Sequence, residues 1–398
     1  MIFTSQRWTR GLRALGTALL LALTACGGGV ETGGTGPTGS SYVEGPIGGF
    51  GSVIVAGIRF DESTARIEDA DGSQRNRDDL RLGMVVAVEA GALADDGSGG
   101  RVGTATRVRL GSQLLGPVTE LDLANSRVSV LGQRVRLSLA TVLDNLPNGA
   151  ASLSLGDILE VHGFFDVNAL TASYVATRIE RRAVVPAAFR VRGIARDVDP
   201  IAKTLRIGGQ IFDLNTVGLP AGLVDGAFVR LTVGPAQVNS RWRVMLVALE
   251  QRQLDDRDDA EIEGLITAFT SVTNFAVNGV TVDASAASPP QGLANGVRVK
   301  VRGRATAGGI AATRIELRSD DDAFTEGVDL RDAIANLNTS AKTFTLRGVT
   351  VFYGTQPAPR YDNGNEGNLA NTVRVRVRAV LDNTRTRLVA TRIEFVTN

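Results

Sequence analysis

The chain repeats one pattern five times, and this repetition limits its possible folds more than any other feature. The pattern is the phrase Leu-x-x-Gly-x-x-Val-x-Val-x-Gly, with related residues accepted at each position. It begins at Leu80, Leu153, Leu223, Leu293 and Leu369. The fourth copy fits best, and the fifth has Thr372 where the others have glycine. Such a sequence is expected to fold into one small structure several times over.

Two further phrases mark the start and the end of each repeat. A glycine followed by an apolar run opens the repeats at Gly45, Gly116, Gly193, Gly264 and Gly327. A closing phrase, Ala-Thr-Arg-Ile or a close variant, begins at Ala105, Ala176, Ala312 and Ala390, and is degenerate at 247–250 in the third copy. The openings lie 63 to 77 residues apart, which is too long for a solenoid coil and suits a small domain.

Within a repeat, apolar residues alternate with polar ones. Residues 297–302 alternate valine with a basic residue, and 373–378 do the same. This period of two predicts half-buried antiparallel strands. Asn278-Gly279 stands between two apolar runs and predicts a two-residue hairpin. Gly132 and Gly348 mark the same place in other repeats. We expect five or six short strands in each repeat and no long helix.

A short unit made of strands must protect its sheet edges, and closing into a small barrel achieves this. We therefore predict an all-β fold of five tandem small β-barrel modules, OB-like in outline, with β-sandwich modules as the alternative. In the Leu-x-x-Gly turn, the leucine should plug the barrel and the glycine should adopt a backbone conformation that is costly for other residues. The expected modules are 43–112, 113–183, 188–252, 260–318 and 324–398.

The first 25 residues have the composition of a secretory signal peptide. Three arginines precede the apolar run 14–23, which is too short for an ordinary transmembrane helix. The segment 1–25 is followed by Cys26, and Leu23-Thr24-Ala25-Cys26 resembles a bacterial lipobox. This resemblance predicts that Cys26 is lipidated and anchors the chain in a membrane. A plain cleaved signal with an incidental cysteine is the alternative.

The segment 26–42 is rich in glycine, threonine and serine and is expected to be a flexible tether. Its stretch 34–39 matches G-x-G-x-x-G, but a dinucleotide site needs a strand before it and a helix after it. We therefore assign this match no function. Gly27 is not the aspartate that retains lipoproteins in the inner membrane. The resemblance thus favours the outer membrane, on either its periplasmic or its surface face.

Composition excludes several classes of function. The chain has 43 basic and 42 acidic residues, and loss of 1–25 removes three arginines and leaves it near neutral. Such a balance gives no global attraction to nucleic acid or to anionic membranes. One cysteine permits no intrachain disulfide and no cysteine-rich zinc site. The single histidine, His162, excludes a multi-histidine metal centre, and no cofactor is expected.

With the three phrases in this order, the chain resembles the repeating unit called domain of unknown function 5666. That unit occurs in tandem in secreted bacterial proteins and lipoproteins. The resemblance covers about residues 43–396, and the third and fifth copies depart from it most. Because the recurring phrases are structural, the resemblance implies a fold and a location and supplies no catalytic residues.

His162 is the first candidate for chemistry. A hydrolase would need a nucleophile and a carboxylate placed on this histidine, and the chain has no G-x-S-x-G sequence. The matching positions in the other repeats hold Glu89, Thr232, Arg302 and Arg378. We therefore expect His162 to lie on an exposed strand face and to have no catalytic role.

Acidic runs between repeats are the second candidate. Carboxylates clustered at domain junctions could bind calcium through their oxygen atoms. A solvated, self-repelling linker is the favoured alternative, because an arginine interrupts one run and the other junctions lack such a cluster. The weak calcium candidates are Asp255, Asp256, Asp258, Asp259, Asp320, Asp321 and Asp322.

Basic rows on two predicted strands are the third candidate. A basic stripe on a barrel could bind a polyanion such as lipopolysaccharide, whereas nucleic acid would also require stacking aromatic residues, which are scarce here. Glu316 and Glu394 on the following strands can pair with these basic residues across the sheet, and a solvated strand face is the favoured alternative. The residues of the rows are Arg298, Lys300, Arg302 and Arg304 in the fourth repeat and Arg374, Arg376 and Arg378 in the fifth.

These observations together predict a non-enzymatic, lipid-anchored envelope protein that acts as a multi-module structural, binding or adhesion element. Repetition favours this prediction because spacers and multivalent binders use many copies of one unit. The alternative is an envelope lipoprotein that binds polysaccharide or another polyanion. A hydrolase ranks third, since no acid–base pair recurs at matched positions. We expect a membrane, reached through Cys26, and an envelope polysaccharide or protein as partners, and no nucleic acid.

Overall fold

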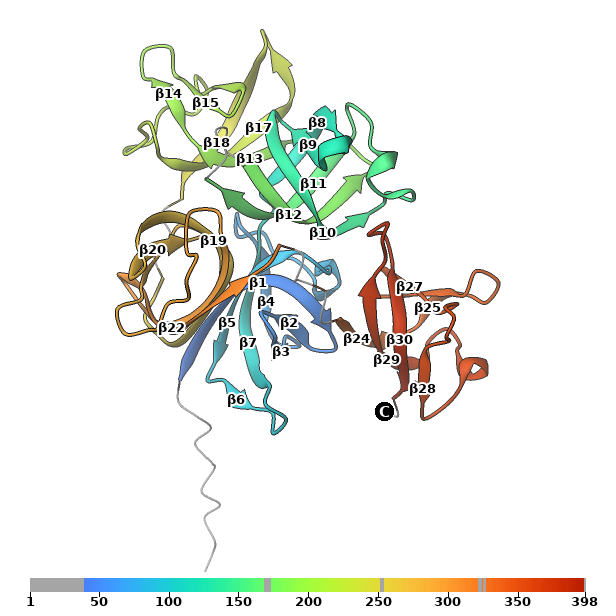
Figure 1. The fold of residues 1–398 in the computed structure, drawn as a ribbon. Helices are drawn as coiled ribbons and strands as arrows, with labels where there is room; N and C mark the ends of the chain where they lie inside the picture. Colours follow the sequence, from blue (N-terminus) through green and yellow to red (C-terminus); the bar gives the residue numbers. More distant parts are fainter. Residues whose placement is uncertain (1–38, 168–172, 251–253, 321–323, 325–326, 397–398) are drawn as a thin grey trace, which may run out of the picture. The chain divides into compact units, whose positions relative to one another are not determined.

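The computed structural model describes residues 39–167, 173–250, 254–320, 324 and 327–396. Within these ranges the chain consists of β-strands β1 to β30 and short 3₁₀ turns (Figure 1). The predicted all-β fold is thus confirmed. No helix in the described ranges has both the length and the apolar character needed to cross a membrane. The predicted signal peptide, Cys26 and most of the predicted tether lie outside the described residues.

The strands fall into five successive groups, called units one to five below. Unit one has β1 (Ser40–Phe50), β2 (Val53–Val55), β3 (Ile58–Asp61), β4 (Arg66–Asp69), β5 (Val85–Gly91), β6 (Ala94–Asp95) and β7 (Arg101–Leu110). Unit two has β8 (Leu114–Asp122), β9 (Arg127–Val130), β10 (Gln133–Asp144), β11 (Ile158–Asp166) and β12 (Ser173–Arg182). Unit three has β13 (Phe189–Ile194), β14 (Arg196–Asp199), β15 (Thr204–Ile207), β16 (Gln210–Asp213), β17 (Phe228–Val238) and β18 (Arg241–Leu249).

The last two units complete the described chain. Unit four has β19 (Arg257–Ser271), β20 (Asn274–Val277), β21 (Val280–Asp283), β22 (Arg298–Thr306) and β23 (Gly309–Arg318). Unit five has β24 (Val328–Ala333), β25 (Ala335–Asn338), β26 (Thr343–Leu346), β27 (Val349–Phe352), β28 (Arg360–Asp362), β29 (Arg374–Leu381) and β30 (Leu388–Phe395). The 3₁₀ turns are η1 (Arg77–Asp79), η2 (Leu123–Asn125), η3 (Gly149–Ser152) and η5 (Glu366–Asn368).

Units two and four are closed five-strand barrels. In unit two, hydrogen-bonded pairing runs β8–β9–β10–β12–β11 and returns to β8. In unit four it runs β19–β20–β21–β23–β22 and returns to β19. Each ring contains one parallel pair, β10–β12 or β21–β23, and the remaining pairs are antiparallel. Closure leaves these barrels without free edges.

The other units use the same order of strands with additions or interruptions. In unit one the order is β5–β1–β2–β3–β7, and β4 and β6 are extra strands beside β7. In units three and five the opening strand is interrupted by one residue, Ala195 or Ile334, which separates β13 from β14 and β24 from β25. A shared strand order is the structural counterpart of the shared phrases.

The Leu-x-x-Gly turn docks on the opening strand in the same way in all five units. The fourth residue of the turn donates its N–H to the carbonyl of one residue of the opening strand. That same strand residue donates its own N–H to the carbonyl of the residue that follows the fourth residue of the turn. All ten bonds measure 2.8–2.9 Å. The pairs of turn and strand residues are Gly83 and Ile47, Gly156 and Val118, Gly226 and Ala195, Gly296 and Ile266, and Thr372 and Ile334.

The predicted roles of the leucine and the glycine in this turn are confirmed. The five leucines are each at most 8% exposed, so they fill the interior beside the turn. The four glycines have φ between +77° and +91°, a region that glycine enters without a steric penalty. Thr372 adopts the same conformation, with φ of +74°. The fifth unit therefore keeps the turn and accepts a strained residue in it.

The strand that carries the end of the Leu-x-x-Gly-x-x-Val-x-Val-x-Gly phrase pairs with the strand that carries the closing phrase, and this pairing contains a β-bulge. In every unit the register between these two strands shifts just before this position. Small residues face each other there in four units: Ala90 and Ala105, Gly163 and Ala176, Gly303 and Ala312, and Ala379 and Ala390. A Cβ atom on Gly303 would lie 2.0 Å from the Ala311 carbonyl oxygen. Close packing at the bulge thus explains why small residues recur at these positions in the repeats.

The predicted hairpins are also present. Asn278 and Gly279 have φ of +49° and +82° and join β20 to β21. Gly132 and Gly348 have φ of +69° and +75° in the turns that precede β10 and β27. Positive φ at both central residues is the geometry of the tight turn that matches strand twist.

Strand pairing and core packing also join units. β1 pairs in parallel with β19 of unit four and with β24 of unit five, and β8 pairs with β13 of unit three. One buried apolar cluster combines residues of units one and five, and another combines units two and three. The units are therefore not independent beads, because neighbouring units share hydrogen bonds and apolar contacts.

Candidate functional site

In the fourth unit, the basic row on β22 is paired with acidic residues of β19. Arg298 lies 2.6 Å from Glu263, Lys300 lies 3.2 Å from Glu261, and Arg302 lies 3.2 Å from Asp259. Each distance joins a side-chain nitrogen to a carboxylate oxygen. Arg304, at the end of the row, is exposed. Three of the four predicted binding residues are therefore already matched by carboxylates within their own unit.

Arg298 lies in the protein interior and not on its surface. It is 3% exposed, and its guanidinium carbon lies 5.1 Å from the centre of the Phe164 ring. A buried arginine requires both a carboxylate and hydrogen bonds to offset its loss of hydration. Glu263 and the Ser319 carbonyl, at 3.4 Å, supply them. Arg298 is thus unavailable to an external polyanion in this structure.

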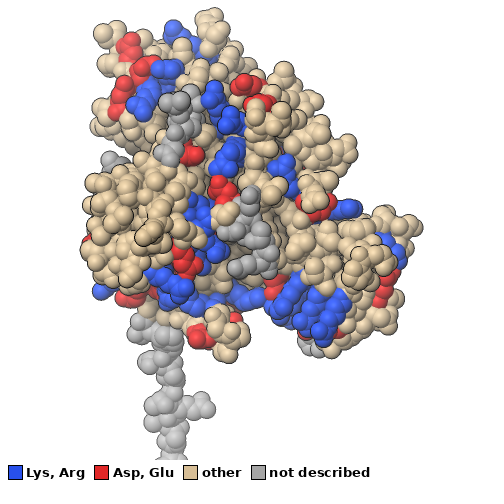
Figure 2. Space-filling view, in the orientation of Figure 1, with Lys and Arg blue, Asp and Glu red and all other residues tan. Residues whose placement is uncertain are grey.

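The equivalent row on β29 of the fifth unit is more open. Arg374 and Arg378 are exposed, whereas Arg376 is half-buried and hydrogen-bonds Asp329 of β24 at 2.9 Å. Asp329 also accepts from Arg59 at 2.9 Å. Burial acts to raise the pKa of Asp329, but its bonds to these two arginines hold that pKa below the ordinary value. Figure 2 shows basic side chains gathered at the lower right, where Figure 1 places strands of unit five.

The glutamates predicted to pair with the rows lie where the sequence placed them. Glu316 is directly opposite Lys300, and Glu394 is directly opposite Arg376. Their closest ion pairs are nevertheless different. Glu316 lies 2.6 Å from Arg314 of its own strand, while Lys300 and Arg376 bind carboxylates of the strand on their other side. Cross-strand register was therefore predictable, but the choice of partner was not.

The acidic runs are engaged in separate local contacts. Asp255 pairs with Arg257 at 3.3 Å, Asp258 accepts from the Ser40 N–H at 3.2 Å, and Asp259 pairs with Arg101 at 2.9 Å. Asp256 accepts from the Ala307 N–H and Asp320 pairs with Arg136. Asp321 and Asp322 lie outside the described residues. In the described part of the chain, no three His, Cys, Asp or Glu side chains are grouped to hold a metal ion.

His162 is buried, and the prediction of an exposed strand face at this position was wrong. Its side chain is 2% exposed. The outer face of β11 and β12, which a lone barrel would present to water, is covered by the Leu-x-x-Gly turn of unit one. Thr177 donates its hydroxyl to the Gly83 carbonyl at 2.6 Å, and Arg178 donates to the Leu82 carbonyl at 3.3 Å. Contact with another unit, which one repeat cannot reveal, buries this face.

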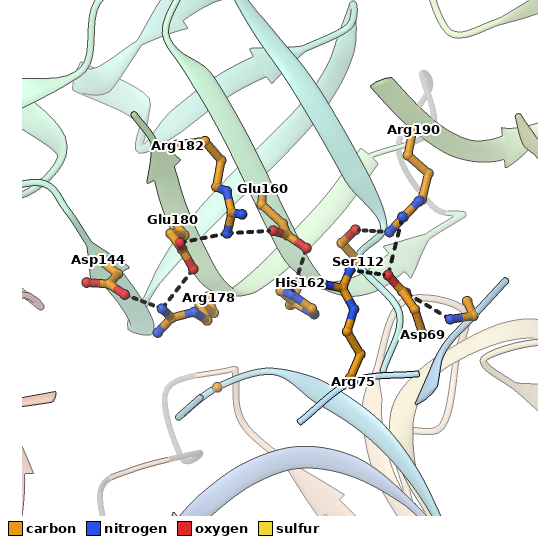
Figure 3. Close-up of polar contacts among 12 residues, drawn as sticks. Asp69, Arg75, Ser112, Asp144, Glu160, His162, Arg178, Glu180, Arg182 and Arg190 are labelled. Carbon is orange, nitrogen blue, oxygen red and sulfur yellow. Dashed lines mark hydrogen bonds and ion pairs between the residues drawn. The ribbon is translucent and has the colours of Figure 1, made fainter. Parts of the chain in front are cut away.

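This covered face carries a chain of charged side chains (Figure 3). Arg178 bonds Asp144 and lies 3.2 Å from Glu180, and Glu180 lies 2.9 Å from Arg182. The chain continues from Arg182 to Glu160 at 3.4 Å and from Glu160 to His162 at 3.6 Å. Arg178 itself is 1% exposed, so these carboxylates offset the cost of burying its charge.

Glu160 is the strongly perturbed acid of this group. Burial acts to raise its pKa, but the contact with His162, 3.6 Å away, and the charge of Arg182 outweigh it and lower the pKa to about 2. The carboxylate is therefore ionised at neutral pH. A general acid or base that works near neutrality needs a pKa close to that pH, and Glu160 does not meet this requirement.

A second charged cluster lies beside the first in Figure 3 and contains a serine. Asp69 lies 2.7 Å from Arg75 and 3.4 Å from Arg190, and Arg190 donates to the Ser112 hydroxyl at 2.9 Å. A nucleophilic serine needs a base that accepts its proton, whereas the group bonded to Ser112 is a cationic donor. This arrangement fixes charged groups in place and provides no activated nucleophile.

Sequence reasoning missed both clusters, because their members are distributed over several strands and units. The closing phrase offered one signal, since its arginine recurs as Arg107, Arg178, Arg314 and Arg392. Three of these arginines are partly or fully exposed, and only the second is buried. The phrase therefore does not distinguish a buried arginine from an exposed one.

Comparison with known proteins finds a family model that matches parts of the chain and solved structures that resemble it. No curated protein sequence matches the chain. The solved structure described as "drosophila Unr CSD456" is 11% identical, and the likeness covers 52% of this chain and 96% of that chain with a TM-score of 0.14. The family model described as Domain of unknown function (DUF5666) matches residues 116–180, 263–316 and 333–394. Those segments fall in units two, four and five, so the chain contains DUF5666 repeats.

Proposed function

We propose that this chain is a non-enzymatic, lipid-anchored protein of the bacterial cell envelope whose five units act together as a structural, binding or adhesion element. The observation that carries the proposal is the turn that recurs in every unit with the same pair of hydrogen bonds. The residues common to the repeats are those that hold this turn and the β-bulge. Recurrence of scaffold residues without recurrence of reactive ones is typical of modular binding and spacer proteins.

We further propose that all five units are small OB-like barrels. The five-strand ring of units two and four is a short Greek-key type of closure with one parallel pair, as OB folds have. Units three and five support the proposal that the same barrel occurs beyond units two and four. In each of them, one residue alone separates the two parts of the opening strand. Such barrels present outer strand faces and loops to partners, while their interiors are filled by side chains.

Anchoring through Cys26 is tested in cells of the producing bacterium. The wild-type chain is expected to take up a radiolabelled fatty acid and to remain in the outer-membrane fraction, because several acyl chains bind a bilayer firmly. The Cys26→Ala variant should lose both properties. Equal labelling of the two chains would reject the anchor. Protease added to intact cells then distinguishes a surface face from a periplasmic one, with cleavage expected in the exposed segment 182–185.

Absence of enzymatic activity is tested with the purified full chain against generic ester, glycoside and peptide substrates. We expect no turnover above that of a heat-denatured sample. Activity that disappears in a Ser112→Ala or His162→Ala variant that still folds would overturn the proposal. These two residues are the ones to change, since both belong to the charged clusters of Figure 3.

A second candidate function is binding of an envelope polyanion. The exposed arginines Arg374 and Arg378, together with Arg376, favour it, because the equivalent row in unit four is matched by acids. The full chain should be retained on an immobilised polyanion at low salt and released as salt screens the charges. Reversal of these three arginines to glutamate should abolish retention. Unchanged retention after charge reversal would contradict this assignment.

A further inference from the structure

We infer that an acidic polysaccharide, whose negative charges are carboxylates, binds to the outer face of β24, β29 and β30 in unit five and not to the matching face of unit four. This inference rests on the second candidate function and specifies its site and its ligand class. The sequence pattern treated the two basic rows as equivalent. The structure separates them through the residues of the neighbouring strand.

The two rows occupy the same places in their units. Arg374, Arg376 and Arg378 correspond to Arg298, Lys300 and Arg302, because the intervening valines align along β29 and β22. The neighbouring strand provides Leu265, Glu263 and Glu261 opposite the row in unit four. In unit five it provides Ala333, Arg331 and Asp329.

The decisive exchange is at the middle position of the neighbouring strand. Glu263 in unit four is replaced by Arg331 in unit five, so a carboxylate that neutralises the row becomes one more guanidinium group. Arg331, Arg374 and Arg378 are exposed, and none of the three side chains has an ion-pair or hydrogen-bond partner among the described residues. Like charges placed opposite each other destabilise a sheet, so an external anion on this face would relieve repulsion.

The third strand of the face adds little negative charge. β30 contributes Arg392 and Glu394 beside Arg378 and Arg376. Arg392 is bound to Asp362 of β28, and Glu394 is the one carboxylate that β30 provides near the row. Asp329 is shared between Arg376 and Arg59. Carboxylates on this face are thus outnumbered by guanidinium groups.

The spacing of the free arginines suits a linear polymer. Along a strand, side chains on one face repeat every second residue, about 7 Å apart, so Arg374 and Arg378 are separated by about 13 Å with Arg376 between them. Arginine presents a planar fork that binds a carboxylate through two parallel hydrogen bonds. A chain with regularly spaced carboxylates could therefore engage several arginines at once, and multivalency would multiply weak single contacts.

The aromatic residues of this region argue against a nucleic acid as the ligand. Single-stranded nucleic acids need exposed rings on which bases stack. Tyr361 of β28 and Phe395 of β30 are the aromatic residues in these strands, and both pack against the apolar core and are only partly exposed. The face therefore offers charge and hydrogen-bond donors without a stacking surface, which matches a carboxylated sugar chain.

The test measures binding of the full chain to polygalacturonate by titration calorimetry at low salt. The site variant carries Arg331→Gln, Arg374→Gln and Arg378→Gln. A matched control variant carries Arg196→Gln, Arg243→Gln and Arg304→Gln, which removes the same number of exposed charges from units three and four. We expect the site variant to bind at least tenfold more weakly and the control variant to stay within twofold of the wild type.

Other outcomes each have a defined meaning. Equal weakening in both variants would show a response to net charge and overturn the inference. If the site variant bound polygalacturonate as tightly as the wild type, the inference would also be overturned. Polyanion binding as a function would then stand. No binding of polygalacturonate by the wild type would reject the inference, and a parallel titration with a single-stranded oligonucleotide and with anionic lipid vesicles then decides whether the second candidate function fails as well.

Discussion

At the scale of single residues, the glycine of the Leu-x-x-Gly turn is the clearest case of a backbone requirement. Gly156 has φ of +87°, and a Cβ atom there would meet nothing within 4 Å. Gly156→Ala should therefore destabilise unit two by about 1 kcal/mol through backbone strain alone. Hydrogen-exchange protection of β8 and β11 in the full chain measures this loss. Thr372→Gly, which removes the same strain from unit five, should leave β29 equally or better protected.

The arginine of the closing phrase should have very different effects in two units. Removing Arg178 leaves Asp144 and Glu180 without their shared cation, and loss of one partner of a buried pair costs about 3 kcal/mol. Arg314 occupies the same place in unit four, but its side chain is 71% exposed, and exposed pairs contribute less than about 1 kcal/mol. Urea unfolding of Arg178→Met and Arg314→Met chains compares the two. Equal losses of unfolding free energy in the two variants would contradict the assignment of Arg178 as a buried ion-pair partner.

At the scale of elements, β11 should respond to acid. The pKa of Glu160 is lowered to about 2 from an ordinary 4.5, so the ionised side chain stabilises the fold above about pH 4.5, and this contribution disappears as the pH falls towards 2. Its size is at most on the order of 3 kcal/mol. The stability difference between the wild type and Glu160→Gln should shrink over that pH range. An exposed control, Asp255→Asn, should follow the wild-type profile, and a constant difference for Glu160→Gln would disprove the idea.

Elements defined by local chemistry were predictable, and those defined by contact between units were not. The Asn278-Gly279 turn, the buried leucines and the positive φ of the turn glycines follow from rules that act within a few residues. The burial of His162 does not, because its strand face is covered by a turn nearly eighty residues earlier in the chain. The partners of the basic rows lie within their own units, on β19 and β24, but these strands are distant from β22 and β29 in the sequence, so rules that act within a few residues did not select them either.

At the scale of the whole molecule, repetition predicted similar units but could not reveal how they associate. Each repeat carries the signals for its own strands, and no phrase encodes the pairing of β1 with β19 and β24. Parallel pairing between distant segments depends on surfaces that exist only after each unit has formed. This dependence also explains why equivalent positions, such as Arg178 and Arg314, have different environments in different units.

Because two apolar cores are each shared by a pair of units, we predict that a destabilising substitution in one unit also destabilises the unit that shares its core. Phe60 of β3 is fully buried in the cluster that joins units one and five, and Phe212 of β16 is fully buried in the cluster that joins units two and three. Replacing a buried phenylalanine by alanine costs about 3–5 kcal/mol. Phe60→Ala should therefore lower hydrogen-exchange protection in β24 and β29 as well as in unit one, and leave β17 unchanged. Phe212→Ala is the matched control and should lower protection in β11 and β12 while sparing β29. Because a bead that folds alone would confine each loss to its own unit, spreading along these two routes would establish that the units are energetically coupled in pairs.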